Sequence, residues 1–506
     1  MQVLRIDKLR PLLHQATRCA RIVPFQGIRK ISNGQVAAAE ATEAPVATGK
    51  NEKSEKKTGK VSAPASSEGK GMIDTQPPRG TRDFFPEEHR LRNWLFGEFS
   101  AVSNLFGFEQ WDAPVLESEE LFVRKAGEEI TDQLYNFEDK GQRRVALRPE
   151  LTPSLARLVL ARQKTLVLPA KWFAIGQCWR YERMTRGRRR EHYQWNMDIV
   201  GVPGVEAEAE LLAAITLFFQ RVGLTSQDVG IKVSSRKVLQ AVLERYGVPA
   251  DMFARVCVIV DKIEKLPREQ IEKELAVLGV APQTIEGVLG AMALKSVDAL
   301  AELLGPESEA VKDIRRLFEL AQGYGYADWL VFDPSVVRGL AYYTGTVFEG
   351  FDREGKLRAI CGGGRYDRLL GTFGGEDQPC CGFGFGDAVI VELLKERGKL
   401  PEFKSQQVDD VVVALDEALR PAANGVAQGL RRCGRRVELV LESKKMKWAF
   451  KHAERLNAGR LVLVGSDEWA RGAVSVKDLA AREQKEMAVA ELLGGGASSS
   501  SSSSQA

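Results

Sequence analysis

Six arginines fall within the eleven residues from Arg180 to Arg190, and apolar stretches lie on both sides of them. Like charges at this density repel one another unless water screens them or an anion binds. The flanking segments 172–175 and 195–200 read as strands, so the sequence predicts a cationic loop between an outgoing and a returning strand. A solvated basic loop and an anion-binding loop both fit the charge alone.

Polar residues at even spacing flank this loop. Arg180 and Glu182 would share one face of the outgoing strand, and Gln194 and Asp198 would share one face of the return strand. This spacing predicts a sheet face that carries phosphate, amide and carboxylate ligands together.

A second polar cluster is Arg338-Gly-Leu-Ala-Tyr-Tyr-Thr-Gly345. Arginine grips a carboxylate or phosphate in two places, and buried tyrosines supply apolar walls with an orienting hydroxyl. The octapeptide therefore suits a small charged ligand. A hairpin whose tyrosines belong to the core is the structural alternative.

Leu147-Arg-Pro-Glu-Leu-Thr-Pro153 adds two acceptors, Glu150 and Thr152, around a turn fixed by proline. Both suit a substrate ammonium group. A glutamate that precedes a helix is more often a capping or helix-dipole residue, so this segment has a structural reading as well.

The folded part of the chain mixes helices and strands. Apolar spacing from Leu91 to Phe106 and from Leu211 to Val222 predicts two amphipathic helices. Residues 236–325 show helical periodicity throughout and predict a helical insertion. After Gly398, apolar strands separated by helical stretches predict a small parallel-sheet domain.

The chain ends have a different composition. Residues 1–40 hold seven Lys or Arg against two acids and lack the continuous apolar run of a secretory signal, which is typical of an organellar transit peptide. A disordered cytosolic extension is the alternative. Residues 37–76 and the Gly-Ser tail 494–506 read as disordered segments.

Several classes of protein are disfavoured by the composition. No run approaches the roughly 20 apolar residues of a membrane span, so we expect no membrane segment. Seven scattered cysteines without a C-x-x-C pair, and only four histidines, indicate neither a zinc site nor a disulfide framework. A net charge of +4 does not by itself argue for nucleic acid.

Taken in order, these segments resemble the histidyl-tRNA synthetase family of class II aminoacyl-tRNA synthetases. In the arginine-rich motif, the resemblance implies that Arg180 holds the α-phosphate of ATP, Glu182 meets the adenine, and His192 joins the ATP site. Gln194 would bind the amino acid. Asp198, where the family commonly has glutamate, would accept from the imidazole of histidine.

The remaining substrate ligands follow from the same resemblance. Glu150 and Thr152 would bind the amino group of histidine. Arg338 would be the catalytic arginine that bridges the histidine carboxylate and the α-phosphate, Tyr343 would bind the imidazole, and Tyr342 would line that pocket. The family usually has aspartate where this chain has Ala341.

The largest departure from the family pattern is in Cys381-Gly-Phe-Gly-Phe-Gly-Asp-Ala-Val389. The class pattern ends in Gly-x-Glu-Arg, and its arginine covers the adenine and contacts the γ-phosphate, but this chain has Asp387 and Ala388. Either another cation, such as Arg183, Arg188 or a magnesium ion, meets the γ-phosphate, or the enzyme is weakened.

The resemblance implies an α+β catalytic domain over residues 77–400 with an antiparallel sheet and the helical insertion 236–325, followed by an α/β anticodon-binding domain over 408–493 with a basic face between Arg431 and Lys451. It implies a homodimer with Pro114 near the two-fold axis, ATP as a substrate, and Mg²⁺ with unknown protein ligands.

The expected activity is adenylation of histidine and its transfer to the 3′ end of tRNA(His), in a chloroplast, a mitochondrion or both. The rival reading is a non-catalytic, histidine-binding regulatory paralogue like the regulatory subunit of ATP phosphoribosyltransferase.

Overall fold

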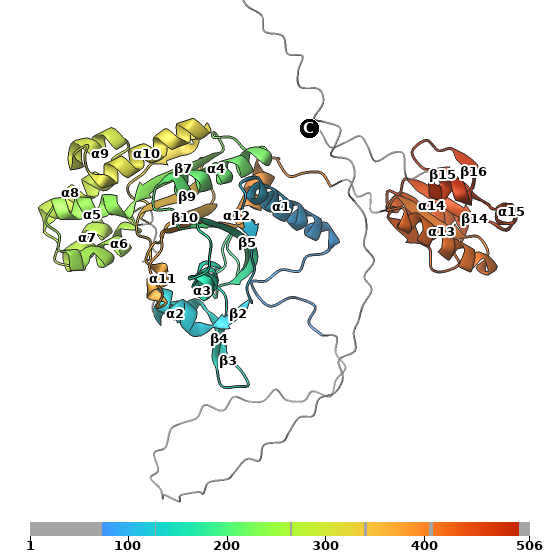
Figure 1. The fold of residues 1–506 in the computed structure, drawn as a ribbon, viewed down its shortest axis with the longest axis horizontal. Coiled ribbons are helices and arrows are strands. Elements are labelled where there is room, and N and C mark those ends of the chain that lie inside the picture. The colour runs from blue at the N-terminus through green and yellow to red at the C-terminus, as the bar shows by residue number, and fades with distance from the viewer. Residues whose placement is uncertain (1–72, 127, 264–265, 338–341, 404–407, 495–506) are drawn as a thin grey trace, which may run out of the picture. The chain divides into compact units, whose positions relative to one another are not determined.

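The computed structural model describes residues 73–126, 128–263, 266–337, 342–403 and 408–494. An eight-stranded sheet organises the part that precedes residue 400, with the strand order β1-β5-β6-β11-β10-β9-β7-β8 (Figure 1). Neighbouring strands are antiparallel except for the β1–β5 and β7–β8 pairs. The strands are β1 (Glu109–Gln110), β5 (Ala170–Trp179), β6 (Glu191–Val200), β7 (Val229–Ser235), β8 (Leu330–Phe332), β9 (Thr346–Asp352), β10 (Cys361–Arg365) and β11 (Cys380–Gly386).

The alternation along β6 separates the core from the site. Trp195, Met197 and Ile199 point into the main apolar core, where the Trp195 ring stacks on Phe99 with 4.6 Å between centroids. Phe99 comes from α1 (Pro86–Leu105), which packs against α4 (Glu206–Arg221). Because side chains alternate along a strand, the intervening polar residues of β6 face the opposite side of the sheet.

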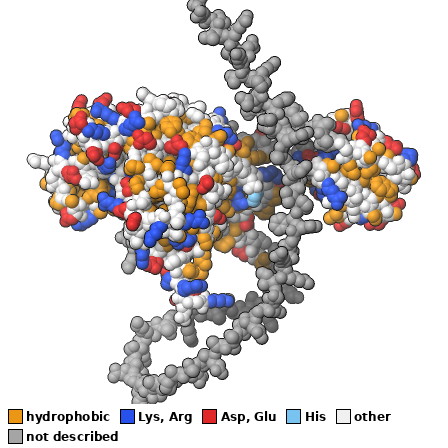
Figure 2. Space-filling view, in the orientation of Figure 1, with side chains coloured by type: hydrophobic (Ala, Val, Ile, Leu, Met, Phe, Trp, Pro, Cys, Tyr) orange, Lys and Arg blue, Asp and Glu red, His pale blue; other side chains and the backbone are white. Residues whose placement is uncertain are grey.

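A small antiparallel sheet precedes the arginine-rich loop. It has the order β2-β4-β3, with β2 (Leu116–Ser118), β3 (Tyr135–Glu138) and β4 (Arg144–Leu147), and it packs against α2 (Glu119–Ala126). Basic side chains gather at the tip of the projecting β3–β4 hairpin (Figure 2). After β4, the chain turns into α3 (Thr152–Arg162), which has a proline in its first turn.

Helices fill the stretch between β7 and β8, as the periodicity predicts, and they lie together in Figure 1. Most of them share a second apolar core that includes Leu239, Val256, Ile271 and Ile285. Proline and serine set several of their starts: Pro267 precedes α7, Pro282 opens α8, and the Ser296 hydroxyl caps α9. The helices are α5 (Arg236–Arg245), α6 (Phe253–Val260), α7 (Arg268–Val277), α8 (Pro282–Met292), α9 (Val297–Leu304) and α10 (Glu309–Tyr324).

Residues 408–494 form a five-stranded sheet with the order β13-β12-β14-β15-β16. The three strands predicted from the apolar runs, β12 (Asp410–Ala414), β13 (Val437–Leu439) and β14 (Arg460–Val464), are parallel. The predicted parallel arrangement of these three strands is confirmed, and two further strands, β15 (Ala473–Asp478) and β16 (Gln484–Ala488), add an antiparallel hairpin that was not predicted. A short connection joins antiparallel strands, whereas each parallel pair needs a crossover. The helices here are α13 (Arg420–Arg432), α14 (Met446–Arg455), α15 (Ser466–Ala470) and α16 (Val489–Gly494).

Candidate active site

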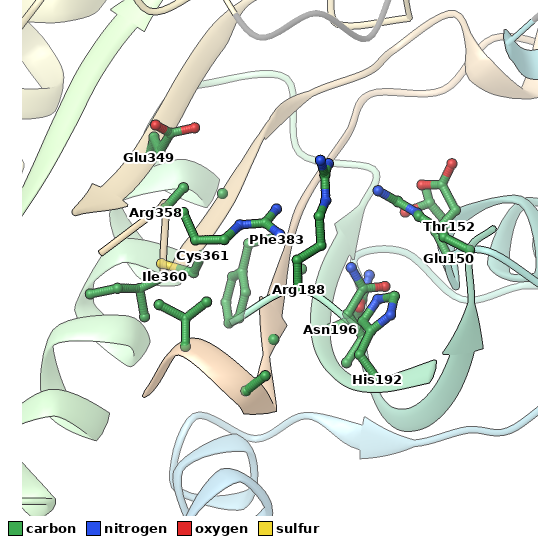
Figure 3. A pocket seen from close by; sticks show the side chains of 18 of the residues that line it. Glu150, Thr152, Arg188, His192, Asn196, Glu349, Arg358, Ile360, Cys361 and Phe383 are labelled. Atoms are coloured by element: carbon green, nitrogen blue, oxygen red, sulfur yellow. The ribbon is translucent and has the colours of Figure 1, made fainter. Parts of the chain in front are cut away.

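A cavity of about 370 Å³ opens on the polar face of the large sheet (Figure 3). Eight of the residues predicted from the sequence line it together, although they come from four separate segments. They are Glu150, Thr152, Arg180, Glu182, His192, Gln194, Tyr342 and Tyr343. Arg338 and Ala341 lie outside the described residues.

The backbone at Arg180 and Glu182 differs from the expectation. β5 ends at Trp179, so both residues lie beyond the strand, and the argument from strand alternation does not apply to them. The chain leaves the sheet because the Tyr181 N–H donates to the Gln133 carbonyl instead of to β6. Arg180 Nε donates to the Pro149 carbonyl at 3.1 Å, and Glu182 pairs with Arg188, so both side chains still reach the cavity.

Glu150 has a cationic partner that the sequence did not reveal. Lys125 Nζ, on α2, lies 2.7 Å from Glu150 Oε2, and the lysine side chain is 1% exposed. The same ammonium sits 3.8 Å from the centroid of the Tyr342 ring. Burial opposes the charged form of Glu150, but the charges of Lys125 and Arg180 outweigh it and lower the pKa of Glu150. The pocket therefore presents a carboxylate at this end.

Asp198 lies directly behind the cavity wall. The Tyr366 hydroxyl donates to Asp198 Oδ1, while Oδ2 is buried without a hydrogen-bond partner in the described part of the chain. Burial raises the pKa of Asp198 to about 7. A Cβ at Gly382, on the neighbouring strand β11, would lie 1.9 Å from Asp198 Oδ1, so only glycine leaves room for this carboxylate. The buried acceptor suits an N–H donor from a ligand.

His192 is neutral at physiological pH. Burial lowers the pKa of its imidazole to about 3, and the charges of Arg180, Arg82 and Arg358 act in the same direction. A neutral ring on the cavity wall can pack against a flat ligand without adding positive charge.

Asp387 makes structural contacts with two neighbouring segments of the chain. Its carboxylate pairs with Arg82 at 3.0 Å and accepts from the Tyr193 N–H at 3.0 Å, and Arg82 also pairs with Glu191 at 2.9 Å. This network joins the segment before α1 to β6 and to α12 (Asp387–Glu396). Asp387 therefore helps to hold these elements together. As an acid, it cannot supply the positive charge for the γ-phosphate.

The sequence did not identify several residues that line or support the cavity. It also left two arginines as candidates for the cation that meets the γ-phosphate. Of the two arginines considered for the γ-phosphate, Arg188 lines the cavity, whereas Arg183 is not among the lining residues. The residues missed are Lys125, Asn196, Glu349, Arg358 and Tyr366. Arg358 and Tyr366 flank the glycine run at 362–364, which could have served as the signal for both.

The basic stretch of the C-terminal domain is partly neutralised from within. Arg435 pairs with Asp410, and Arg436 pairs with Asp409 at 2.7 Å. Lys445 and Lys447 are exposed at the start of α14. The surface that can contact a polyanion is therefore smaller than the sequence suggests.

Within the described residues, no group of three His, Cys, Asp or Glu side chains is placed to hold a metal ion. The search for membrane spans, over the same residues, finds no helix with the length and apolar character to cross a bilayer.

The mostly antiparallel sheet, the arginine-rich loop between β5 and β6, and the polar cavity above them define a class II aminoacyl-tRNA synthetase. The crystal structure of histidyl-tRNA synthetase from Nostoc sp. PCC 7120 shares this fold with a TM-score of 0.68 and 27% identity, covering 84% of this chain and 99% of that chain. Residues 80–387 match the histidyl-tRNA synthetase family, and residues 409–495 match the anticodon binding domain family.

Two curated relatives extend this match over most of both chains. The chain is 64% identical over 420 residues to "Histidine--tRNA ligase, chloroplastic/mitochondrial" of Arabidopsis thaliana, which covers 83% of this chain and 86% of the relative. It is 39% identical to the histidine–tRNA ligase of Opitutus terrae, over 82% of this chain and 96% of that protein. The chain belongs to the histidyl-tRNA synthetase family. The predictions of fold class and of an aminoacyl-tRNA ligase are confirmed, and the regulatory paralogue is not favoured.

Proposed function

We propose that the cavity activates histidine with ATP and that the chain then transfers histidine to tRNA(His). One observation carries this proposal: a single pocket is lined by an anionic end at Glu150 and Thr152 and by a cationic end at Arg180 and Arg188. The first end suits the ammonium group of an amino acid, and the second suits phosphates.

The histidine side chain would lie toward Asp198. Its ring N–H would donate to the buried Asp198 Oδ2, and Tyr343 and Tyr342 would line that part of the pocket. Gln194 would hold the amino acid, because its amide faces the cavity beside Gly384. Glu182 and His192 would contact the adenine.

In the first step, a carboxylate oxygen of histidine attacks the α-phosphorus of ATP, and pyrophosphate leaves. Negative charge accumulates around the α-phosphate, and Arg180 would neutralise it, with Arg338 proposed as the opposing catalytic arginine. In the second step, a terminal ribose hydroxyl of the tRNA attacks the activated carbonyl carbon, and AMP leaves.

Mg²⁺ is part of this proposal as a counter-ion for the phosphates. Glu349 is a carboxylate on the cavity wall, and Mg²⁺ is commonly held by one or two carboxylates together with substrate phosphates. Glu349 would hold the ion, which would neutralise phosphate charge.

Histidine-dependent exchange of pyrophosphate into ATP tests the first step. Arg180→Ala should lower the exchange rate by about 100-fold or more, the loss seen when one donor to a developing charge is removed, while circular dichroism stays unchanged. Arg183→Ala is the matched control, because Arg183 is not among the lining residues of the cavity. Equal rates for Arg180→Ala and the unmodified chain would refute the role given to Arg180.

We also propose an organellar homodimer. The Arabidopsis relative is named chloroplastic/mitochondrial, and the basic N-terminal segment fits import into those compartments. Leu116, two residues after Pro114, and Phe137, on the same small sheet, are 44% and 46% exposed in one copy, which fits an apolar surface for a second copy. Light scattering that gives only a monomer mass would refute the dimer.

A further inference from the structure

Arg358 is a cavity residue to which neither the sequence motifs nor the family pattern assigned a role. It lies between β9 and β10 and lines the pocket together with Arg188 and Gly187 of the arginine-rich loop. A Cβ at Gly187 would lie 3.2 Å from Val389 Cγ2 and 3.8 Å from Arg358 Cδ. The stem of Arg358 therefore runs where the arginine-rich loop meets the first turn of α12.

The charge of Arg358 is not compensated by a direct contact. Among the residues that the structure describes, no hydrogen bond or ion pair joins its guanidinium to another group, whereas the neighbouring Arg188 is paired with Glu182. Burial, Arg188 and Arg180 all lower the pKa of Arg358, with Glu182 and Glu349 acting against them. Such a cation, exposed to the cavity and close to other arginines, favours an anion as its partner.

The position of Arg358 separates it from the amino-acid end of the pocket. Figure 3 shows Glu150 and Thr152 on one side and Arg358, Ile360 and Glu349 on the other, with Arg188 between them. If the α-phosphate lies at Arg180, as proposed above, the rest of the phosphate chain has room to extend toward Arg188 and Arg358.

The first turn of α12 cannot supply this cation itself. Asp387 is held by Arg82, and the next residue, Ala388, lines the same cavity with a methyl group. Counted from Gly386, the class II pattern Gly-x-Glu-Arg places the arginine that contacts the γ-phosphate at Val389, one residue after Ala388. Val389 and the Arg358 stem both lie within 4 Å of a Cβ added at Gly187.

We propose that Arg358 binds the β- and γ-phosphates of ATP, the part that leaves as pyrophosphate, and so replaces the arginine absent from the first turn of α12. This inference rests on the proposed function. It makes Arg358 a ligand of ATP and pyrophosphate, and it excludes contact with the histidyl-adenylate that remains after pyrophosphate has left.

The test uses the full chain and four ligands: ATP, pyrophosphate, histidine and an analogue of histidyl-adenylate. Arg358→Ala should raise the KM for ATP, and the KM for pyrophosphate in the reverse reaction, by about 10- to 100-fold, the loss expected for hydrogen bonds to a charged group. The KM for histidine should change less than about twofold. The same holds for the Kd of a non-hydrolysable histidyl-adenylate analogue, because this analogue lacks the β- and γ-phosphates. Unchanged analogue binding also shows that the variant is folded.

Lys356→Ala is the matched control, because it removes the same charge from the same connection but lies outside the cavity lining. The control should leave all four constants unchanged. Equal KM values for ATP in Arg358→Ala and the unmodified chain would overturn the inference, as would a parallel loss of analogue binding. If the unmodified chain shows no histidine-dependent exchange, the proposed function itself fails.

Discussion

At the scale of single residues, Asp198 shows how burial and hydrogen bonding together set the properties of one carboxylate beside the pocket. It is buried, one oxygen accepts from Tyr366, and the other oxygen lacks a partner among the described residues. The family commonly has the longer glutamate at this position. The shorter carboxylate of Asp198 is not among the residues that line the cavity, so under the proposed function an imidazole would have to reach toward it.

Replacing Asp198 should have opposite effects on stability and on histidine binding. Burial raises the pKa of Asp198 to about 7, whereas the unfolded chain would lose this proton near pH 4. Between these values the folded state holds more protons than the unfolded state, so the free energy of unfolding falls as pH rises from about 4 to about 7. Asp198→Asn removes this loss and should raise the Tm at pH 8 but not at pH 4.

The same variant should raise the KM for histidine at pH 8, because an amide is a weaker acceptor than a carboxylate. Thermal unfolding at both pH values, together with exchange kinetics, checks both effects. The exposed Asp251 provides the control variant, Asp251→Asn. A Tm for Asp198→Asn below that of the unmodified chain at pH 8 would contradict the assignment.

At the scale of residues, the sequence indicated which side chains come together at the cavity better than it indicated the side chains with which they pair. The structure brings Glu150, Thr152, Gln194 and the two tyrosines to one cavity, and their roles as histidine ligands stay predictions. Lys125 could not be found from the sequence, because nothing in the pattern of α2 distinguishes a buried lysine from a solvent-exposed one. Its partner, the Glu150 carboxylate, lies 25 residues further along the chain. Such a pairing depends on how α2 packs against α3.

At the scale of elements, β11 shows why a glycine-rich strand lies beside the site. Gly382 faces the Asp198 carboxylate, and a Cβ at Gly384 would lie 2.9 Å from Gln194 Nε2. Gly386, on the same strand, has no atom within 4 Å of an added Cβ. Two of these glycines therefore make room for polar side chains of β6, and the third does not.

Alanine substitutions along β11 should reproduce this difference. Gly382→Ala places a methyl group against Asp198 and should raise the KM for histidine by about tenfold or more, because the carboxylate must move. Gly386→Ala should leave the KM unchanged, since its φ of −84° and open surroundings accept a side chain. Pyrophosphate exchange at varied histidine concentration measures both variants. Equal KM values for the two would contradict the packing argument.

Strands and helices with strong periodicity were predictable, and connections were not. The helices between β7 and β8 and the first three strands of the C-terminal sheet follow from apolar spacing. The end of β5 at Trp179 does not, because it depends on a backbone hydrogen bond to Gln133 from a different part of the chain. The β15–β16 hairpin was missed because β16, Gln484–Ala488, is polar and largely exposed and has no apolar run to mark it.

At the scale of the whole molecule, the chain combines a catalytic part with a domain of the anticodon-binding family. We expect Lys445 and Lys447 to contact the tRNA backbone, because they are exposed, while Arg435 and Arg436 are paired with acids. The double variant Lys445→Ala, Lys447→Ala should raise the KM for tRNA and reduce its salt dependence, since fewer counterions are released. Pyrophosphate exchange, which needs no tRNA, should be unaffected.

Arg436→Ala is the control for this experiment, because its guanidinium already pairs with Asp409. Charging kinetics at two salt concentrations compare the variants. A KM for tRNA that does not change in the double lysine variant would place the RNA on another surface.

Histidylation of tRNA(His) by the full chain tests the central claim most directly. We predict that histidine becomes ester-linked to the tRNA, that this requires ATP, and that no other amino acid replaces histidine. A chain that binds histidine but neither exchanges pyrophosphate nor charges tRNA would contradict it.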